Sequence, residues 1–203
     1  YYTRRFGEPA SGKKLSIAVI DDESLDFYSS RGMLFIAARP FEENREFLTD
    51  RLQREAAYQW WGQTVGLKSF DDAWLSQGLA AYSACSLRES TLDAPKVAAL
   101  RRELLETALT SEQTAYQYIM FAKGALAFKL LRDTLGEAKF DQLLRNFLQQ
   151  YRGKNASIDD FEKLASATAG TNMRYFIARW VASTGGPEFT SDYLIIRTRG
   201  GKF

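Results

Sequence analysis

The sequence contains no histidine and only one cysteine, Cys85. Without histidine, neither a metal site with imidazole ligands nor a mechanism with a histidine base can form within this chain. A single cysteine excludes an internal disulfide and a zinc cluster built from cysteines. These two absences exclude the commonest zinc sites and the commonest catalytic nucleophile–base pairs. We interpret Cys85 itself as an inert buried thiol.

Blocks of like charge and long apolar runs are also missing. The 27 basic and 25 acidic residues are interspersed, for a formal net charge of +2, which argues against a nucleic-acid or polybasic membrane partner. No apolar run approaches the roughly 18 residues of a spanning helix, so we expect no transmembrane segment. The length of 203 residues is typical of one domain with a sizeable core. Because the chain starts at Tyr1 without methionine, we interpret it as part of a longer protein of unknown compartment.

The first 40 residues have strand character. Leu15, Ile17 and Val19 alternate with smaller residues, and a second apolar run covers residues 33–37. The stretch 21–31 between them is polar and turn-like. We therefore expect two strands here, separated by a turn.

Helical periodicity follows this region. Leu48, Leu52, Ala56 and Trp60 recur at four-residue spacing, which predicts a helix over residues 49–65. Capping residues, glycine stops and apolar stripes predict further helices over 69–88, 95–108, 110–135, 140–151, 157–170 and 173–182.

The order of these elements predicts an α+β fold with its sheet at one end. We expect one domain over residues 1–186, with a strand region at about 1–40 and a helical region at about 44–183. The Gly185-Gly186-Pro187 segment is typical of a linker. We interpret residues 187–203 as a linker and strand, a candidate start of a truncated following domain.

The predicted helix at 49–65 carries the most informative pattern. In an H-E-x-x-H zinc site, two histidines four residues apart bind one metal, and the glutamate after the first is the general base. In one large class the third ligand is a glutamate on the next helix. Here Arg54 and Tyr58 stand at the histidine positions and Glu55 at the base position. Gln77 stands nineteen residues after Tyr58, at the third ligand position.

The neighbouring residues resemble the catalytic domain of the aminopeptidase N family of zinc metallopeptidases, the gluzincins, over nearly the full chain. The segments that carry the resemblance are Gln59-Trp60-Trp61-Gly62, Lys68 to Leu75, Ser76 to Ala80 and Lys123-Gly124-Ala125, with Phe6-Gly7 at the front and Trp180 and Gly186-Pro187 at the end. The resemblance implies a thermolysin-like metallopeptidase fold, in which a small mixed β-sheet is followed by a mainly α-helical region.

The resemblance also implies that the catalytic apparatus has been replaced. Arg54, Tyr58 and Gln77 take the places of the three zinc ligands. A guanidinium offers no lone pair, and glutamine and neutral tyrosine are poor zinc ligands. Phe121 stands where the family has an oxyanion-stabilising tyrosine, and Ser29 where its glutamate grips the substrate's amino terminus. We therefore expect zinc to be absent, with no other cofactor in its place.

These replacements change the expected function. Glu55 would be a relic of the general base, because without zinc the pKa of its water stays far above the value of about 7 that the metal would give it. We predict a non-catalytic pseudopeptidase domain that serves as a scaffold or as a peptide- or protein-binding module, beside the flanking domains of a larger protein. The alternative is a hydrolase with an unconventional or externally completed active site. The candidate cleft residues are Arg54, Glu55, Tyr58, Gln77, Phe121 and Ser29.

Two interpretations of Arg54 stay open. Its guanidinium could take the metal's electrostatic place and bind a carboxylate, or it could fill the vacated space beside water and an acid. Adjacent helical residues do not face each other, so a pair with Glu55 does not follow from the sequence. Tyr58 and Gln77 could hydrogen-bond across the two helices in place of the metal. The three tryptophans Trp60, Trp61 and Trp74 are interpreted as core aromatics.

Overall fold

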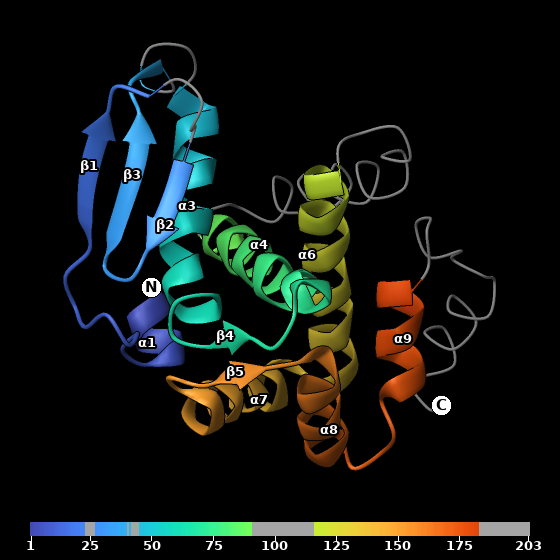
Figure 1. Cartoon of the computed structure of the whole chain (residues 1–203). Coiled ribbons are helices and arrows are strands. Elements are labelled where there is room, and N and C mark those ends of the chain that lie inside the picture. Colours follow the sequence, from blue (N-terminus) through green and yellow to red (C-terminus); the bar gives the residue numbers. More distant parts are fainter. Residues whose placement is uncertain (23–26, 40, 42–44, 91–115, 183–203) are drawn as a thin grey trace.

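The computed structural model describes residues 1–22, 27–39, 41, 45–90 and 116–182 (Figure 1). A small sheet lies at one end, and helices make up the rest of the described chain. This arrangement confirms the α+β prediction. The predicted helix at 95–108, the domain boundary at 186 and the strand of the tail all lie outside the described residues.

The sheet has three strands, β1 (Ser16–Ile20), β2 (Phe27–Ser30) and β3 (Met33–Ala37), in the order β1-β3-β2. β1 runs parallel to β3 and β2 runs antiparallel to it, so the sheet is mixed as predicted. The turn between β2 and β3 contains Gly32, whose φ of 74° favours glycine. The prediction of a turn over 21–31 is wrong at β2, because its sequence shows no apolar alternation that could have marked a strand.

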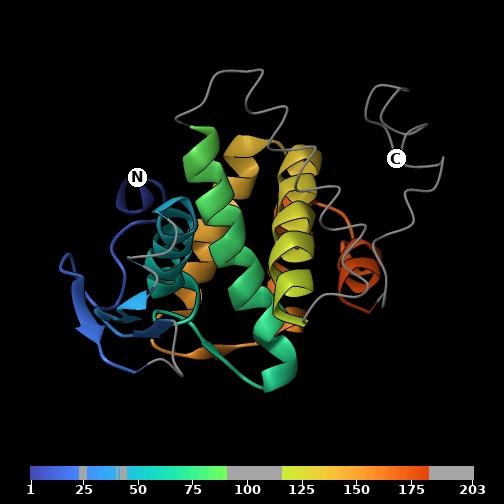
Figure 2. The ribbon, with the colours of Figure 1, turned by 90° about the horizontal axis from the view of Figure 1, so that it is seen from above.

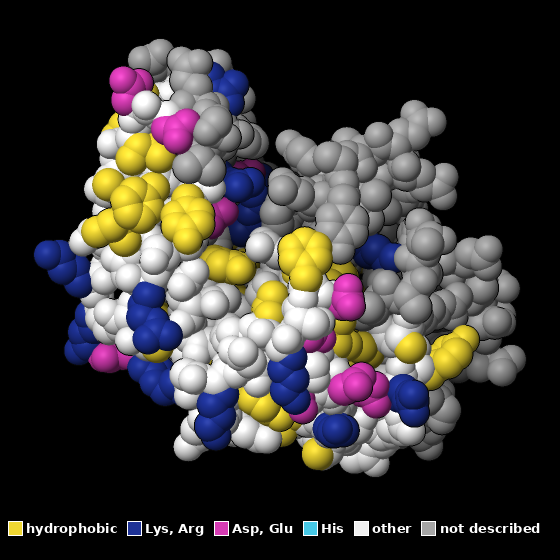
Figure 3. Space-filling view, in the orientation of Figure 1, with side chains coloured by type: hydrophobic (Ala, Val, Ile, Leu, Met, Phe, Trp, Pro, Cys, Tyr) yellow, Lys and Arg dark blue, Asp and Glu magenta, His cyan; other side chains and the backbone are white. Residues whose placement is uncertain are grey.

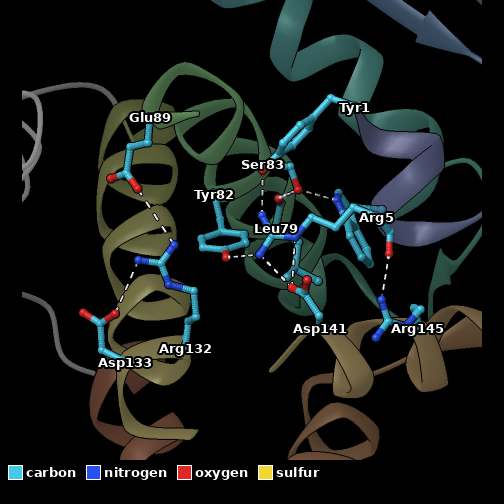
Figure 4. Close-up of polar contacts among 11 residues, drawn as sticks. Tyr1, Arg5, Leu79, Tyr82, Ser83, Glu89, Arg132, Asp133, Asp141 and Arg145 are labelled. Carbon is cyan, nitrogen blue, oxygen red and sulfur yellow. Dashed lines mark hydrogen bonds and ion pairs between the residues drawn. The ribbon is translucent and has the colours of Figure 1, made fainter. Parts of the chain in front are cut away.

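The chain begins with a short helix, α1 (Tyr2–Phe6), where strand character was predicted. A helix this short has no independent stability and needs tertiary contacts. Arg5 supplies them, because its Nε and Nη2 donate to one Asp141 oxygen at 2.9 and 2.7 Å, and Nη2 also donates to the Tyr82 hydroxyl at 3.0 Å (Figure 4). The strand prediction is thus corrected at a segment whose conformation depends on residues far along the chain.

The helical region follows the sheet. Its helices are α3 (Arg45–Trp61), α4 (Ala73–Glu89), α6 (Tyr116–Leu135), α7 (Glu137–Tyr151), α8 (Ile158–Ala169) and α9 (Arg174–Ala182). Figure 2 shows α3, α4 and α6 side by side, with α4 in the middle. The predicted helix at 49–65 in fact begins and ends four residues earlier. No described helix is long and apolar enough to cross a membrane.

Two short strands interrupt the region that was predicted to be helical. β4 (Gly66–Leu67) follows α3, and β5 (Asn155–Ala156) precedes α8. They pair in parallel, with Gly66 opposite Asn155. Strands of two residues carry no periodicity that a sequence pattern could show. Their pairing joins the end of α3 to the start of α8.

Aromatic side chains from four helices make up much of the core. Phe128 of α6 lies 5.0 Å from the Trp74 ring of α4 and 5.6 Å from the Phe161 ring of α8. Phe147 of α7 lies 5.2 Å from Phe161, in the edge-to-face geometry that aromatic pairs favour. Trp60 and Trp61 are buried in the same core, as predicted. Large apolar side chains that stay exposed include four on the sheet: Ile17, Val19, Tyr28 and Met33. Figure 3 shows apolar side chains gathered over the sheet, at the upper left.

Capping boxes fix the starts of two helical segments, as the sequence predicted. The Ser69 N–H donates to the Asp72 carboxylate at 3.0 Å, and the Ser157 N–H donates to Asp160 at 2.9 Å. Asp160 also pairs with Lys68 at 2.7 Å. Burial alone would raise the pKa of Asp160, but the hydrogen bonds from Lys68 and Ser157 outweigh burial and lower that pKa to about 2.

We predict that Lys68→Met raises the pKa of Asp160 toward its ordinary value of 3.8. Because the folded pKa is depressed, this carboxylate stabilises the fold above about pH 4 and loses that effect as the pH falls toward 2. The substitution should therefore move the onset of acid unfolding to higher pH. Carboxyl titration by NMR measures the first effect and circular dichroism the second; an unchanged Asp160 titration would contradict the prediction.

Candidate functional site

Helix α3 presents Arg54, Glu55 and Tyr58 as half-buried side chains. Beside these side chains, Ala57 and Trp61, which are 0% and 2% exposed, anchor the helix in the core. α3 contacts strand β2 and helix α4. The three candidate residues of α3 are thus held on a rigid element between the sheet and the next helix.

The carboxylate of Glu55 is bound by an arginine one turn earlier on the same helix. Arg51 Nε lies 3.1 Å from Glu55 Oε1, at the i, i+4 spacing that lets helical side chains meet. The same guanidinium lies 5.0 Å from the ring centroid of Phe27 in β2, a cation–π contact. Glu55, at the predicted general-base position, is therefore part of an ion pair that also contacts the sheet.

Tyr58 reaches from α3 to α4. Its ring covers Gly62, where any larger residue would collide with it. Burial raises the pKa of the phenol, and a hydrogen bond with the Ser76 hydroxyl offsets part of that increase. The phenol is therefore neutral at physiological pH, when tyrosine is a weak ligand for a cation.

Gln77 follows Ser76 on α4 and is half-buried. In the described part of the chain, its side chain makes no hydrogen bond, and the Tyr58 hydroxyl pairs with Ser76 instead. The expected hydrogen bond between Tyr58 and Gln77 is therefore wrong. Tyr58 contacts α4 at Ser76, one residue before the predicted partner Gln77. Gln77 is therefore the next residue along α4 from this contact.

Two glycines allow α4 and α6 to cross at close range. A Cβ atom on Gly124 would lie 2.6 Å from the Gly78 Cα, and one on Gly78 would lie 3.0 Å from the Gly124 Cα. Only glycine leaves room for such an approach. The crossing brings the α6 backbone at Gly124 against the α4 backbone at Gly78, the residue after Gln77. The Phe121 side chain itself lies outside the described part of the structure.

Ser29 belongs to β2 and lies on the sheet face that α3 covers. It stands opposite Leu34, which is 1% exposed, and its hydroxyl accepts a hydrogen bond from Gln59 Nε2 at 2.9 Å. Gln59 also accepts from the Gly32 N–H at 2.8 Å and donates to the Ser30 carbonyl at 2.9 Å. Gln59 therefore fixes α3 to the β2–β3 hairpin. Sequence reasoning missed this role, although a polar residue between two apolar neighbours, Tyr58 and Trp60, was a signal.

Two acids of α3 form ion pairs with arginines, one within the helix and one across to α4. Glu55 pairs with Arg51, and Asp50 lies 2.8 Å from Arg88 of α4. Figure 3 shows basic and acidic side chains together beside the sheet, at the position of α3 in Figure 1. The neighbouring pair Arg54 and Glu55, which the sequence left open, is replaced by the pair between Arg51 and Glu55.

Helix α6 carries a buried basic residue. Lys123 is only 5% exposed, and burial lowers its pKa. The sequence singled it out only as part of the Lys123-Gly124-Ala125 segment. A lysine amine is expensive to bury as a cation, which explains the direction of the change.

The residues at the ligand positions do not fit zinc. Arg54 stays protonated, Tyr58 is held as a neutral phenol and Gln77 provides an amide. Among the described residues, no group of three or more His, Cys, Asp or Glu side chains is placed to hold a metal ion. Zinc needs thiolate, imidazole or carboxylate ligands, so no chemical step here can be derived through it.

Comparison with known proteins shows which protein family this chain resembles. Residues 13–180 match the Peptidase family M1 domain. A glutamyl aminopeptidase from Bitis rhinoceros is 23% identical over 184 residues, covering 81% of this chain and 19% of that protein. A probable aminopeptidase 1 from Sulfurisphaera tokodaii is 27% identical over 158 residues, covering 68% of this chain and 20% of that protein. The chain thus spans about a fifth of the length of these curated relatives.

Solved structures of similar fold include members of the same family. A variant M1 zinc metallopeptidase from Deinococcus radiodurans, bound to a Tyr-ser-ala substrate, has a TM-score of 0.70 and 25% identity, over 92% of this chain and 42% of that one. Leukotriene A4 hydrolase from Saccharomyces cerevisiae, at 16% identity, has the same fold with a TM-score of 0.75, over 92% of this chain and 34% of that one. The resemblance to zinc aminopeptidase catalytic domains is confirmed. The chain belongs to peptidase family M1.

Proposed function

We propose that this chain is a non-catalytic, metal-free M1 domain that binds a peptide or protein segment as a module of a larger protein. The observation that carries the proposal is the set of side chains at the ligand positions. Arg54, Tyr58 and Gln77 offer no thiolate, imidazole or carboxylate, and these are the groups that hold zinc. Without the metal, no bound water is activated for attack on a peptide bond.

The ion pair between Arg51 and Glu55 supports the same proposal. A general base must have a carboxylate oxygen available to water, and one oxygen of Glu55 lies 3.1 Å from the Arg51 guanidinium instead. The pair also contacts β2 through Phe27, so Glu55 has a structural role that explains its presence. A peptide is the proposed ligand class, because the similar Deinococcus radiodurans enzyme is described as bound to a tripeptide substrate.

A hydrolase completed from outside is the second candidate. Two observations favour it: Glu55 still stands at the general-base position, and the chain spans only about a fifth of its curated relatives. Ligands for a metal would then come from another part of the protein or from a partner. This candidate predicts zinc-dependent turnover, which the first candidate excludes.

We expect the purified chain to release no fluorophore from aminoacyl-coumarin substrates above the background rate, with or without added zinc. Loss of one oxyanion donor alone typically costs about 10²–10³ in rate, and loss of metal activation adds to it. The matched control is Glu55→Gln, which should give the same trace as the unmodified chain. Turnover that requires zinc and disappears in Glu55→Gln would contradict the proposal and favour the hydrolase.

A further inference from the structure

Four connecting segments that lie far apart in the sequence meet below the sheet. They follow α1, β2, α3 and α7, and they cover residues 7–15, 31–32, 62–65 and 152–154. The Gly153 N–H donates to the Thr64 carbonyl at 2.8 Å, and the Ala10 N–H donates to Thr64 Oγ1 at 2.8 Å. The Gly66 N–H, at the start of β4, donates to the Lys154 carbonyl at 2.9 Å. Thr64 therefore joins three of the four segments.

The turn between β2 and β3 is the fourth segment, and it contacts two of the others. Arg31 Nη2 donates to the Gln63 carbonyl at 3.4 Å. A Cβ atom on Gly32 would lie 3.4 Å from the Ser11 Cβ and 3.8 Å from the Lys14 carbonyl oxygen. The fold thus assembles one surface from segments that the sequence keeps apart.

This surface carries five exposed basic side chains with one exposed acid among them. The basic residues, which we call the basic patch, are Lys13, Lys14, Arg31, Arg152 and Lys154, and the acid is Glu8. Glu8 pairs with Lys13 at 3.1 Å, and in the described part of the chain no other acid pairs with the basic patch. Arg152 donates to the Glu8 and Pro9 carbonyls, which carry no net charge. Five positive charges and one negative charge leave plus four. Figure 3 shows basic side chains with one acidic side chain at the left, below the sheet.

We propose that the basic patch binds an acidic segment of a partner protein. Exposed charge of one sign attracts and orients a partner of the opposite sign. A second copy of this chain does not supply such a segment, because its acids are interspersed with bases. The inference goes beyond the proposed function, since it concerns residues outside the candidate site and holds whether or not the domain is catalytic.

The make-up of the surface favours protein carboxylates over a nucleic acid or a membrane. The four segments contain no aromatic residue on which a base could stack. Their larger apolar residues, Pro9, Leu15 and Val65, are buried or half-buried, so none is presented to lipid. Glu8 would repel the closely spaced phosphates of a nucleic acid, whereas the carboxylates of a protein segment can lie around it.

Binding of fluorescein-labelled hexaglutamate to the full chain is measured by fluorescence anisotropy at low ionic strength, because salt screens exposed charges. The test variant combines Lys14→Glu and Lys154→Glu, which reduces the charge of the surface from plus four to zero. The matched control combines Lys139→Glu and Arg174→Glu, at exposed positions of α7 and α9, and gives the chain the same net charge. Thermal melting shows that each variant is folded.

We expect the test variant to bind hexaglutamate about tenfold or more weakly than the unmodified chain, and the control to bind like the unmodified chain. The milder pair Lys14→Gln and Lys154→Gln, which leaves plus two on the surface, should have an intermediate affinity. Raising the salt concentration should weaken binding to the unmodified chain.

Absence of hexaglutamate binding by the unmodified chain would overturn the inference. Binding that survives in the folded test variant, or that is lost equally in the control, would overturn the assignment to the basic patch. Two further probes are single-stranded oligothymidine and vesicles of phosphatidylcholine with phosphatidylserine. Tighter binding of either one would overturn the choice of an acidic protein segment. None of these results bears on the metal-free assignment, which is tested by turnover and zinc content.

Discussion

Replacing Gly124 by alanine should lower the free energy of unfolding by about 3 kcal/mol, the upper part of the usual range for an overpacked core. The added Cβ would lie 2.6 Å from the Cα of Gly78, which is backbone and cannot rotate away. The two helices must therefore separate, and the contacts beside the crossing, including that of Phe128 with Trp74, must loosen. Chemical denaturation followed by circular dichroism measures the loss.

An exposed helical position provides the control for this substitution. Alanine normally stabilises a helix relative to glycine by about 0.5–1 kcal/mol. Ala167 of α8 is exposed, so Ala167→Gly should show that ordinary preference. The protein would then be more stable with alanine than with glycine at position 167, and much less stable with alanine than with glycine at position 124. A stability of Gly124→Ala equal to or above that of the unmodified chain would show that α4 and α6 do not cross as described.

We expect zinc binding when the predicted ligand positions carry the residues of an H-E-x-x-H site. The variant combines Arg54→His, Tyr58→His, Gln77→Glu and Phe121→Tyr. Two histidines four residues apart on α3, with a carboxylate on α4, are the three-ligand set of a catalytic zinc with one open position. We expect one equivalent of zinc in this variant after reconstitution. The bound metal should also raise its melting temperature, because a ligand that binds only the folded state stabilises it.

The control for the restored site keeps three substitutions and leaves Gln77 unchanged. Without the carboxylate, zinc would have two protein ligands, so its affinity should fall well below that of the fourfold variant. Inductively coupled plasma spectrometry and melting with and without a chelator compare the two. Failure of the folded fourfold variant to bind zinc would show that positions 54, 58 and 77 do not converge.

Elements with strong periodicity could be predicted from the sequence, and elements fixed by distant contacts could not. The apolar stripe of α7 and the capping box of α8 correctly predicted these two helices, because each signal lies within a single element. The helix α1 was missed, because its conformation depends on Arg5 bonding to Asp141 and Tyr82. Figure 4 shows that these partners come from helices far along the chain. β2 was missed because its four residues lack alternation.

In the candidate site, too, the local placement of residues on helices could be predicted, whereas the contacts between helices could not. Arg54 and Tyr58 lie on α3 and Gln77 lies on α4, the two helices that the sequence predicted for them. The pair between Arg51 and Glu55 follows the i, i+4 rule, so the sequence contained the signal for it. The partner of Tyr58 depends on the packing of α3 against α4 to within one residue, which the sequence does not specify.

The central claim, that this M1 domain works without a metal, is tested most directly by the zinc content of the purified chain. The chain is incubated with excess zinc, separated from unbound metal by gel filtration and analysed by inductively coupled plasma spectrometry against protein concentration. Because Arg54, Tyr58 and Gln77 cannot hold the ion, we expect far less than one zinc per chain. One equivalent of tightly bound zinc, lost on replacement of Gln77 or Tyr58, would contradict the claim.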